Sequence, residues 1–168
     1  VVPSMSYHNG QRMRSDAAAA LVSMAAASYR EGAGRIGIAS GYRSYDTQRS
    51  LYNSKVATPG QAYADTWVLR PGYSEHQAGL TTDLKPIGRS NCSSHTCIDE
   101  TPPGAWLAQN PWRSGVSLRY ESGRPSTTGI SFEPWHFRFV GTPLSTAYRD
   151  GGWHTYEQFL DEPAAPTY

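Results

Sequence analysis

Two short segments of this 168-residue chain carry side chains that could together hold a metal ion. The first contains His76 and, seven residues later, Asp83, and the second contains Glu133 and, three residues later, His136. A catalytic zinc site takes three ligands from histidine or acidic side chains and leaves a fourth position for water. His76, Asp83 and His136 could supply these ligands. Glu133 could stand beside them as the carboxylate that takes a proton from the water.

The spacing of His76 and Asp83 sets a condition on the backbone between them. On one regular strand, residues seven apart face opposite sides of the sheet, because side chains alternate. Gly79 lies between the two and gives the chain the freedom to bend them toward one metal. The same spacing is also typical of a histidine and an aspartate hydrogen-bonded at the surface. The residues alone therefore leave both interpretations open.

Several common catalytic motifs are absent from the sequence. It contains no G-x-S-x-G elbow, no S-x-x-K pair, no H-E-x-x-H motif and no P-loop of the form G-x-x-x-x-G-K-[ST]. Serine acyl transfer and nucleotide chemistry are therefore disfavoured. The other histidines, His8, His95 and His154, lie in polar or terminal contexts, and we expect them to be solvated.

The composition is that of an ordinary globular protein. Hydrophobic residues make up 38% of the chain and charged residues 17%, which is too apolar for a disordered chain. The formal net charge is +1, so we expect no nucleic-acid partner and no strong attraction to a membrane surface. No apolar run reaches the roughly 18 residues of a transmembrane segment. We expect any export signal or anchor to lie outside this chain.

Local signals predict the elements that must position the two segments. Helices are expected over 17–31, 46–56, from Thr58-Pro59 to just before Pro71, and in one turn at 105–109. Strands are expected over 35–40, 80–84, 116–120 and 137–140, with a polar loop over 86–103. Helices cluster early and strands late, which favours an α+β fold around an antiparallel sheet. We predict one domain over 1–168, with its core over about 15–142 and a helical C-terminal tail over 143–168, broken at Gly151-Gly152.

Two cysteines, Cys92 and Cys97, lie five residues apart in the polar loop. They could close a small disulfide, which would imply an oxidising compartment. The alternatives are two unreacted thiols, or half of a metal site with His95 between them. The disulfide is favoured, because the chain has no second Cys/His pair that would complete a zinc knuckle.

Three segments, in this order, resemble the zinc D-alanyl-D-alanine carboxypeptidases of the VanY type. They are SGYRSYDTQ over 40–48, PGYSEHQAGL over 71–80 and EPWHFRFVG over 133–141. The resemblance covers roughly residues 15–142. It implies the small α+β fold shared with hedgehog signalling domains, in which an antiparallel sheet flanked by helices carries one zinc ion.

The resemblance also implies roles for single residues. His76, Asp83 and His136 match the zinc ligands, and Glu133 matches the general base. Arg43 matches the arginine that holds substrate oxygen, either the C-terminal carboxylate or the developing oxyanion. A planar guanidinium that is always charged suits both tasks.

Three further residues are expected to surround the metal site. Gln48 and Ser74 match positions that line the substrate pocket, and the alternative for both is structural support or helix capping. Thr81 stands where the family usually has alanine. We expect its hydroxyl to hydrogen-bond Asp83 beside the ligands.

The resemblance implies an exported bacterial enzyme that removes the terminal D-alanine from a peptidoglycan stem peptide or its precursor. We expect the protein to be a monomer. One alternative is an L,D-carboxypeptidase or an endopeptidase of the same superfamily. Another, of a different class, is a cell-wall binding module that keeps the zinc only as structure. Glu133 argues against the module, because a structural zinc site needs no base and tends to close its fourth position.

Overall fold

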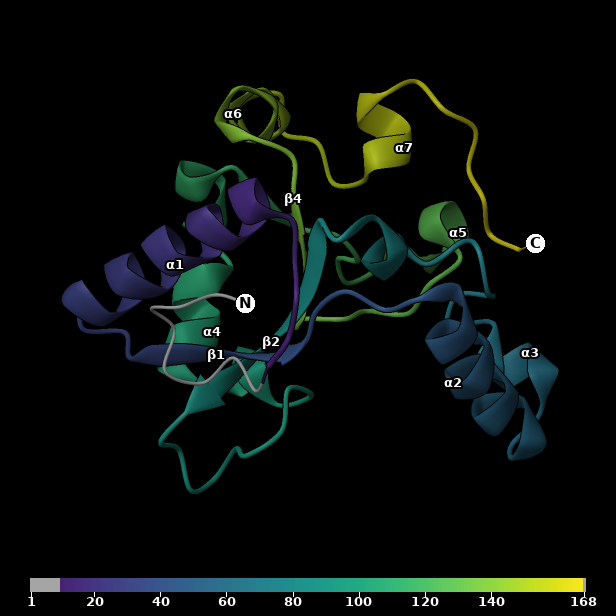
Figure 1. The fold of residues 1–168 in the computed structure, drawn as a ribbon. Coiled ribbons are helices and arrows are strands. Elements are labelled where there is room, and N and C mark those ends of the chain that lie inside the picture. The colour runs from purple at the N-terminus through teal and green to yellow at the C-terminus, as the bar shows by residue number, and fades with distance from the viewer. Residues whose placement is uncertain (1–9, 168) are drawn as a thin grey trace.

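The computed structural model describes residues 10–167 as helices around a four-stranded antiparallel sheet (Figure 1). An alanine-rich segment forms α1 (Ser15–Arg30), followed by β1 (Arg35–Ser40) and α2 (Tyr45–Ala57). The hydroxyl of Ser44 caps α2 by accepting a hydrogen bond of 3.2 Å from the Thr47 amide. The bounds of these three elements agree with the sequence prediction to within two residues.

The helix predicted from Thr58-Pro59 is wrong in its start and its length. The next helix, α3, begins only at Gln61 and ends at Ala64 (Gln61–Ala64). Thr58 is extended backbone at the end of α2. Its hydroxyl donates to the Ala57 carbonyl oxygen at 2.7 Å. That hydroxyl therefore caps no new helix at this point.

The sheet consists of β1, β2 (Thr81–Ile87), β3 (Val116–Leu118) and β4 (His136–Phe139), in the order β1-β2-β4-β3. All three neighbouring pairs are antiparallel, which confirms the predicted α+β class. β2 runs beyond the predicted end at Leu84 and includes Pro86. β4 pairs with β2 only as far as Asp83, so the proline lies where one side of β2 is unpaired, a position in which proline is tolerated.

The hydrophobic core lies between α1 and the sheet (Figure 1). α1 buries Leu21 and Met24, and the sheet buries Ile38, Leu84 and Phe137 in the same cluster. This core fixes β2 and β4, which carry Asp83 and His136.

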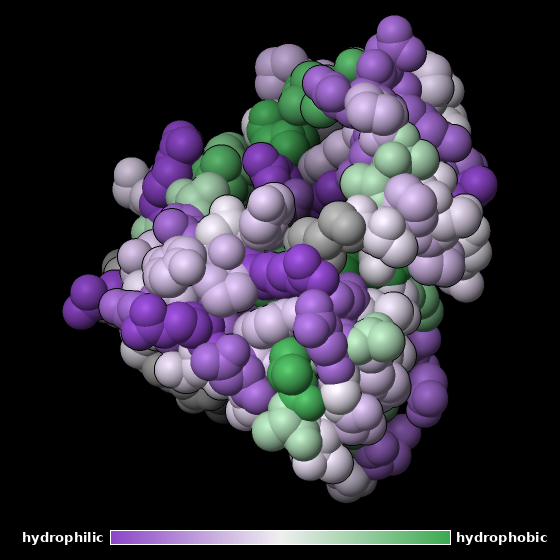
Figure 2. Space-filling view, turned by 90° about the vertical axis from the view of Figure 1, so that its right-hand side faces the viewer, coloured by the Kyte–Doolittle hydropathy of each residue, from purple (hydrophilic) through white to green (hydrophobic). Residues whose placement is uncertain are grey.

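Short helical elements and the C-terminal helices complete the fold. They are η1 (Glu75–Ala78), η2 (Ile98–Glu100), α4 (Pro102–Leu107), η3 (Pro111–Ser114), α5 (Pro125–Thr128), α6 (Thr142–Asp150) and α7 (Tyr156–Phe159). The predicted break in the tail at Gly151-Gly152 separates α6 from α7. Within residues 10–167, no helix is long and apolar enough to cross a membrane. The face that carries α2 and α3 is mostly hydrophilic, and its hydrophobic side chains form small, separate groups (Figure 2).

Candidate metal centre

Three buried side chains meet where η1, β2 and β4 come together. His76 lies on η1, Asp83 on β2 and His136 on β4. The register of β2 and β4 pairs Asp83 directly with His136, and opposite residues of an antiparallel pair lie on the same face of the sheet. One possible ligand atom from each of the three residues lies within 4.8 Å of the others. The structure thus brings together the three residues that the sequence put forward as ligands.

A left-handed turn at Gly79 joins His76 to Asp83. The glycine has φ +69°, a conformation that other residues adopt only at a cost. A β-carbon at this position would also lie 3.3 Å from the Arg14 amide nitrogen. His76 is therefore on a separate short helix, not on the strand of Asp83, and the odd spacing of the two residues is accommodated.

The nitrogen that each imidazole turns toward the centre can be identified from its neighbours. His76 Nδ1 lies 2.6 Å from the Gly41 carbonyl oxygen, so this nitrogen carries the proton and donates. Nε2 of the same ring lies 3.4 Å from Asp83 Oδ1. His136 turns its Nδ1 toward the centre, at 3.3 Å from the same oxygen.

The atoms at the centre fit a bound cation. His76 Nε2 and Asp83 Oδ1 are buried and have no hydrogen-bond partner among the described residues. Buried polar atoms are rarely left in this state without a ligand, water or ion. Two imidazoles and one carboxylate are a donor set typical of zinc with one coordination position left for water.

The charges of the site also favour a bound cation. Burial lowers the pKa of His76, and the negative charge of Asp83 opposes this only in part, so the ring is neutral, as metal binding requires. Burial acts against ionisation of Asp83, but the two histidines outweigh it and hold the pKa of that carboxyl well below its usual range. Burial likewise acts against a charged His136, but the carboxylates of Asp83, Glu133 and Glu75 hold its pKa well above the usual value, so a bound metal would displace a proton from this ring. The centre is therefore rich in negative charge that a cation would neutralise.

Glu133 lies beside the three candidate ligands in the loop before β4. Its Oε2 is 3.3 Å from His136 Nδ1, the nitrogen that faces the centre. Its amide donates to the Tyr120 carbonyl oxygen at 3.1 Å, and its own carbonyl accepts from the His136 amide at 3.1 Å. These backbone bonds fix a carboxylate next to the centre.

A pocket of about 630 Å³ opens onto Asp83, Glu133 and His136. Arg43 and Gln48, which the sequence placed at the substrate, also line this pocket, as does Ser74. Burial lowers the pKa of Arg43, and the charges of Asp83 and Glu133 oppose this. Its Nε has no partner among the described residues.

The side chain of Gln48 has one hydrogen-bonded atom and one unpaired atom. Its Nε2 donates to the Leu69 carbonyl oxygen at 2.6 Å, which fixes the amide plane. Its Oε1 is buried without a partner in the part of the chain that the structure describes. Arg43 and Gln48 therefore offer one donor and one acceptor at the wall of the pocket.

A disulfide between Cys92 and Cys97 closes the loop beside this pocket. The loop carries His95, whose ring stands edge-on to Trp135 at 5.1 Å between ring centroids. Both rings line the pocket. The prediction that His95 is solvated is therefore wrong, because the aromatic contact leaves it half-buried. His154 is exposed as expected, and His8 lies outside the described residues.

The role of Glu75 was not predicted from the sequence, and Thr81 has a different partner from the predicted one. Glu75 Oε2 lies 3.5 Å from His136 Nε2, on the side of the ring away from the centre. Thr81 donates to the same oxygen at 3.5 Å and not to Asp83 as predicted. The Asp83 carboxylate is turned toward the two histidines, which leaves Glu75 as the acceptor for the threonine. The position of Glu75 next to the candidate ligand His76 could have pointed to a role at the metal centre. The contact of Glu75 with His136, however, depends on the turn at Gly79.

Known proteins match most of this chain. A family model described as VanY, D-alanyl-D-alanine carboxypeptidase, matches residues 10–142. A D-alanyl-D-alanine carboxypeptidase of Enterococcus faecium is 38% identical over 124 residues, which are 74% of this chain and 36% of that protein. The chain thus spans about a third of that relative's length.

Two solved structures share the fold. The LdcB LD-carboxypeptidase superimposes with a TM-score of 0.80 at 32% identity, over 90% of this chain and 69% of that one. The D,D-pentapeptidase VanY of a VanB-type resistance cassette, a mutant in complex with Zn(II), superimposes with a TM-score of 0.79 at 32% identity, over 90% of this chain and 85% of that one.

Proposed function

Because the chain belongs to the VanY family of D-alanyl-D-alanine carboxypeptidases, we propose that it is a zinc-dependent carboxypeptidase. Its substrates are peptidoglycan stem peptides, or their precursors, that end in D-Ala-D-Ala, from which it removes the terminal D-alanine. The observation that carries this proposal is the convergence of His76, Asp83 and His136 beside the carboxylate of Glu133.

His76 Nε2, Asp83 Oδ1 and His136 Nδ1 would hold the zinc ion. The related VanY structure in complex with Zn(II) supports this choice of metal. When bound, zinc polarises a carbonyl group and lowers the pKa of a water molecule in its fourth position.

The reaction is hydrolysis of an amide. Glu133 takes one proton from the attacking water, whose oxygen adds to the scissile carbonyl carbon, and it gives that proton to the leaving nitrogen as the C–N bond breaks. Glu133 Oε2 suits this task because it is fixed beside the centre and is not one of the three ligands.

The pocket wall binds the substrate in this proposal. The Arg43 guanidinium holds the terminal carboxylate of the peptide, since Nε is buried and unpaired. The Gln48 carbonyl oxygen accepts a hydrogen bond from a substrate N–H, and Ser74 lines the same wall. Together they orient the last residue of the peptide against the metal.

We place this activity outside the cytoplasm, in one monomeric domain with its core over about 15–142. The disulfide between Cys92 and Cys97 supports the location, because disulfides persist in oxidising compartments. The match of the family model to residues 10–142 supports the extent of the core.

A second candidate is an L,D-carboxypeptidase, favoured by the superposition on LdcB. Mass spectrometry of defined muropeptides, incubated with the zinc-loaded protein, separates the candidates. Loss of one alanine from a pentapeptide that ends in D-Ala-D-Ala supports the proposal. Loss of alanine from a tetrapeptide alone supports the second candidate, and internal cleavage indicates an endopeptidase. If the peptides remain unchanged, the proposal is overturned and a non-catalytic binding module is indicated. Glu133→Ala protein is the inactive control.

A further inference from the structure

The ring nitrogen of His136 that faces away from the metal centre lies against one carboxylate. Nε2 is 3.5 Å from Glu75 Oε2. Because Nδ1 must offer its lone pair to a metal, the proton of the neutral ring belongs on Nε2 and needs an acceptor there. Nε2 is buried and has no hydrogen-bond partner among the described residues, so its ion-pair contact with Glu75 is the polar contact it makes. Glu75 is therefore the acceptor within reach.

Glu75 is itself held in this position by two arginines. Its Oε1 accepts a hydrogen bond from Arg119 Nε at 2.9 Å and forms an ion pair with Arg138 Nη1 at 2.7 Å. The side chains of Glu75 and Arg119 are only 12% and 11% exposed. With Oε1 occupied by the arginines, Oε2 is left for His136 and Thr81.

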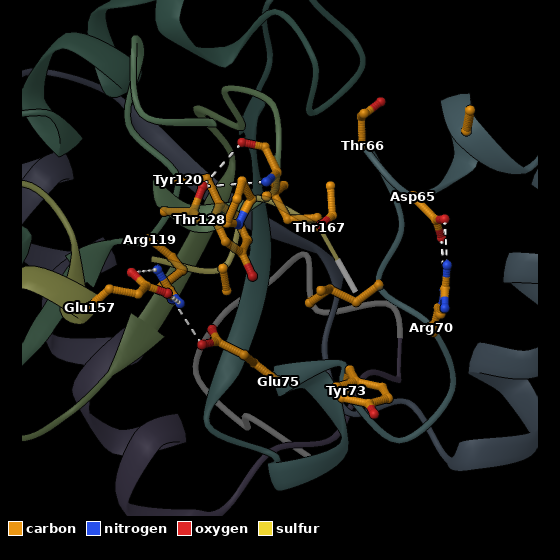
Figure 3. Close-up of a pocket in the computed structure, with 16 residues that line it drawn as sticks. Asp65, Thr66, Arg70, Tyr73, Glu75, Arg119, Tyr120, Thr128, Glu157 and Thr167 are labelled. Carbon is orange, nitrogen blue, oxygen red and sulfur yellow. Dashed lines mark hydrogen bonds and ion pairs between the residues drawn. The ribbon is translucent and has the colours of Figure 1, made fainter. Parts of the chain in front are cut away.

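The outer end of this network comes from the C-terminal segment. Glu157 on α7 binds Arg119 through two hydrogen bonds, of 2.6 Å to Nη2 and 3.2 Å to Nη1. Thr155, fully buried, caps α7 by accepting from the Gln158 amide at 3.2 Å. Figure 3 shows the resulting chain of contacts from Glu157 through Arg119 to Glu75. α7 lies beyond residue 142, outside the part of the chain that the family model matches.

The network forms part of the wall of a second cavity, of about 550 Å³. Glu75, Arg119 and Glu157 all line it, and each is paired with another of them. None of the unpaired buried side-chain atoms of the described residues belongs to this wall. The charged groups here therefore serve one another and His136, and they present no unpaired atom to a second ligand.

We propose that Glu75, Arg119 and Glu157 are positioning residues that fix the ring of His136 for zinc, and that α7 thereby supports the metal centre. This inference rests on the zinc site of the proposed function. Glu75 holds the proton on Nε2 and the plane of the ring, Arg119 holds Glu75, and Glu157 holds Arg119. Carboxylates that accept from a metal-bound histidine typically change metal affinity 10- to 100-fold when they are replaced.

The test compares zinc dissociation constants, measured by competition with a chromophoric chelator. Glu75→Gln is expected to weaken zinc binding about 10- to 100-fold. Glu157→Gln is expected to weaken it less than Glu75→Gln but more than a control. The control is Glu31→Gln, because Glu31 binds Arg113 through two hydrogen bonds of 2.7 and 3.0 Å, the same arrangement, and lies outside the metal pocket. The control is expected to bind zinc as the wild type does.

Two further measurements separate positioning from general stability. Cobalt(II) in place of zinc should give a changed visible absorption spectrum in Glu75→Gln, because the ligand field follows the orientation of His136. Thermal unfolding measures stability for all variants. If Glu75→Gln and Glu157→Gln lower the melting temperature but bind zinc with the wild-type dissociation constant, the inference is overturned. If the wild-type protein itself binds no stoichiometric zinc, the proposed function is overturned.

Discussion

Asp83 and His136 lie opposite each other across β2 and β4, and Asp83 Oδ1 is 3.3 Å from His136 Nδ1. Two of the three candidate ligands are thus held by one pair of strands, whose positions are fixed by the hydrophobic core. The third, His76, reaches the same oxygen at 3.4 Å from a short helix. A site built mainly on paired strands keeps its geometry without the metal, so we expect the apoprotein to fold.

Replacing any one ligand should lower the zinc content. The protein is expected to bind one zinc per chain, and His76→Ala, Asp83→Ala and His136→Ala should each lose most of it, because a centre left with two ligands binds zinc weakly. Elemental analysis of the purified proteins measures this. Single variants that keep one zinc per chain would show that the metal lies elsewhere.

Glu133→Ala should abolish turnover and retain zinc. The carboxylate is proposed to move a proton, and general acid–base groups typically contribute about 10²- to 10⁴-fold. Its Oε2 lies 3.3 Å from His136 Nδ1, so the alternative role for Glu133 is that of a zinc ligand instead of the general base. Peptide hydrolysis and zinc content measured on the same preparation decide between them, since loss of zinc would make Glu133 a ligand and a near-wild-type rate would exclude it as the base.

Cys92 and Cys97 should be oxidised in protein from an exporting host. Closing so short a loop is expected to add only about 2 kcal/mol to the free energy of unfolding. The Cys92→Ser, Cys97→Ser double variant should therefore remain folded, while His95 loses its fixed place beside Trp135. Alkylation under denaturing, non-reducing conditions tests the pairing, and labelling of both thiols would contradict it.

The sequence predicted the candidate ligands because histidine and aspartate are chemically specific and their segments resemble a known family. It also predicted the bend at Gly79, since an odd spacing on one strand would have separated the side chains. The strand order was not predictable in the same way. It depends on which strands pair, and local signals describe only single elements.

The role of Glu75 could not be predicted from the sequence. Its contacts with Arg119, Arg138 and His136 join residues more than forty positions apart. No local pattern distinguishes such a glutamate from a solvated one. The Thr58-Pro59 prediction failed for a different reason, because the same two residues are typical of a helix start and of an extended link.

The remaining prediction concerns the end of the substrate. If Arg43 pairs with a free terminal carboxylate, capping that carboxylate as an amide removes a charge-assisted hydrogen bond worth about 1.5–3 kcal/mol. The specificity constant for an amidated pentapeptide that ends in D-Ala-D-Ala should therefore fall at least about tenfold. Arg43→Lys should weaken turnover of the free acid, because a point charge cannot reproduce the planar fork.

The assay quantifies D-alanine or D-alanine amide released from the two peptides. An exopeptidase recognises the charged end through Arg43, whereas an endopeptidase must let the chain continue past the scissile bond and is indifferent to the cap. The Arg43→Lys protein should discriminate less between the two peptides than the wild type, since the contact that reads the carboxylate is weakened. Equal rates of the wild type on the free and the amidated peptide would overturn the carboxypeptidase proposal and leave the endopeptidase.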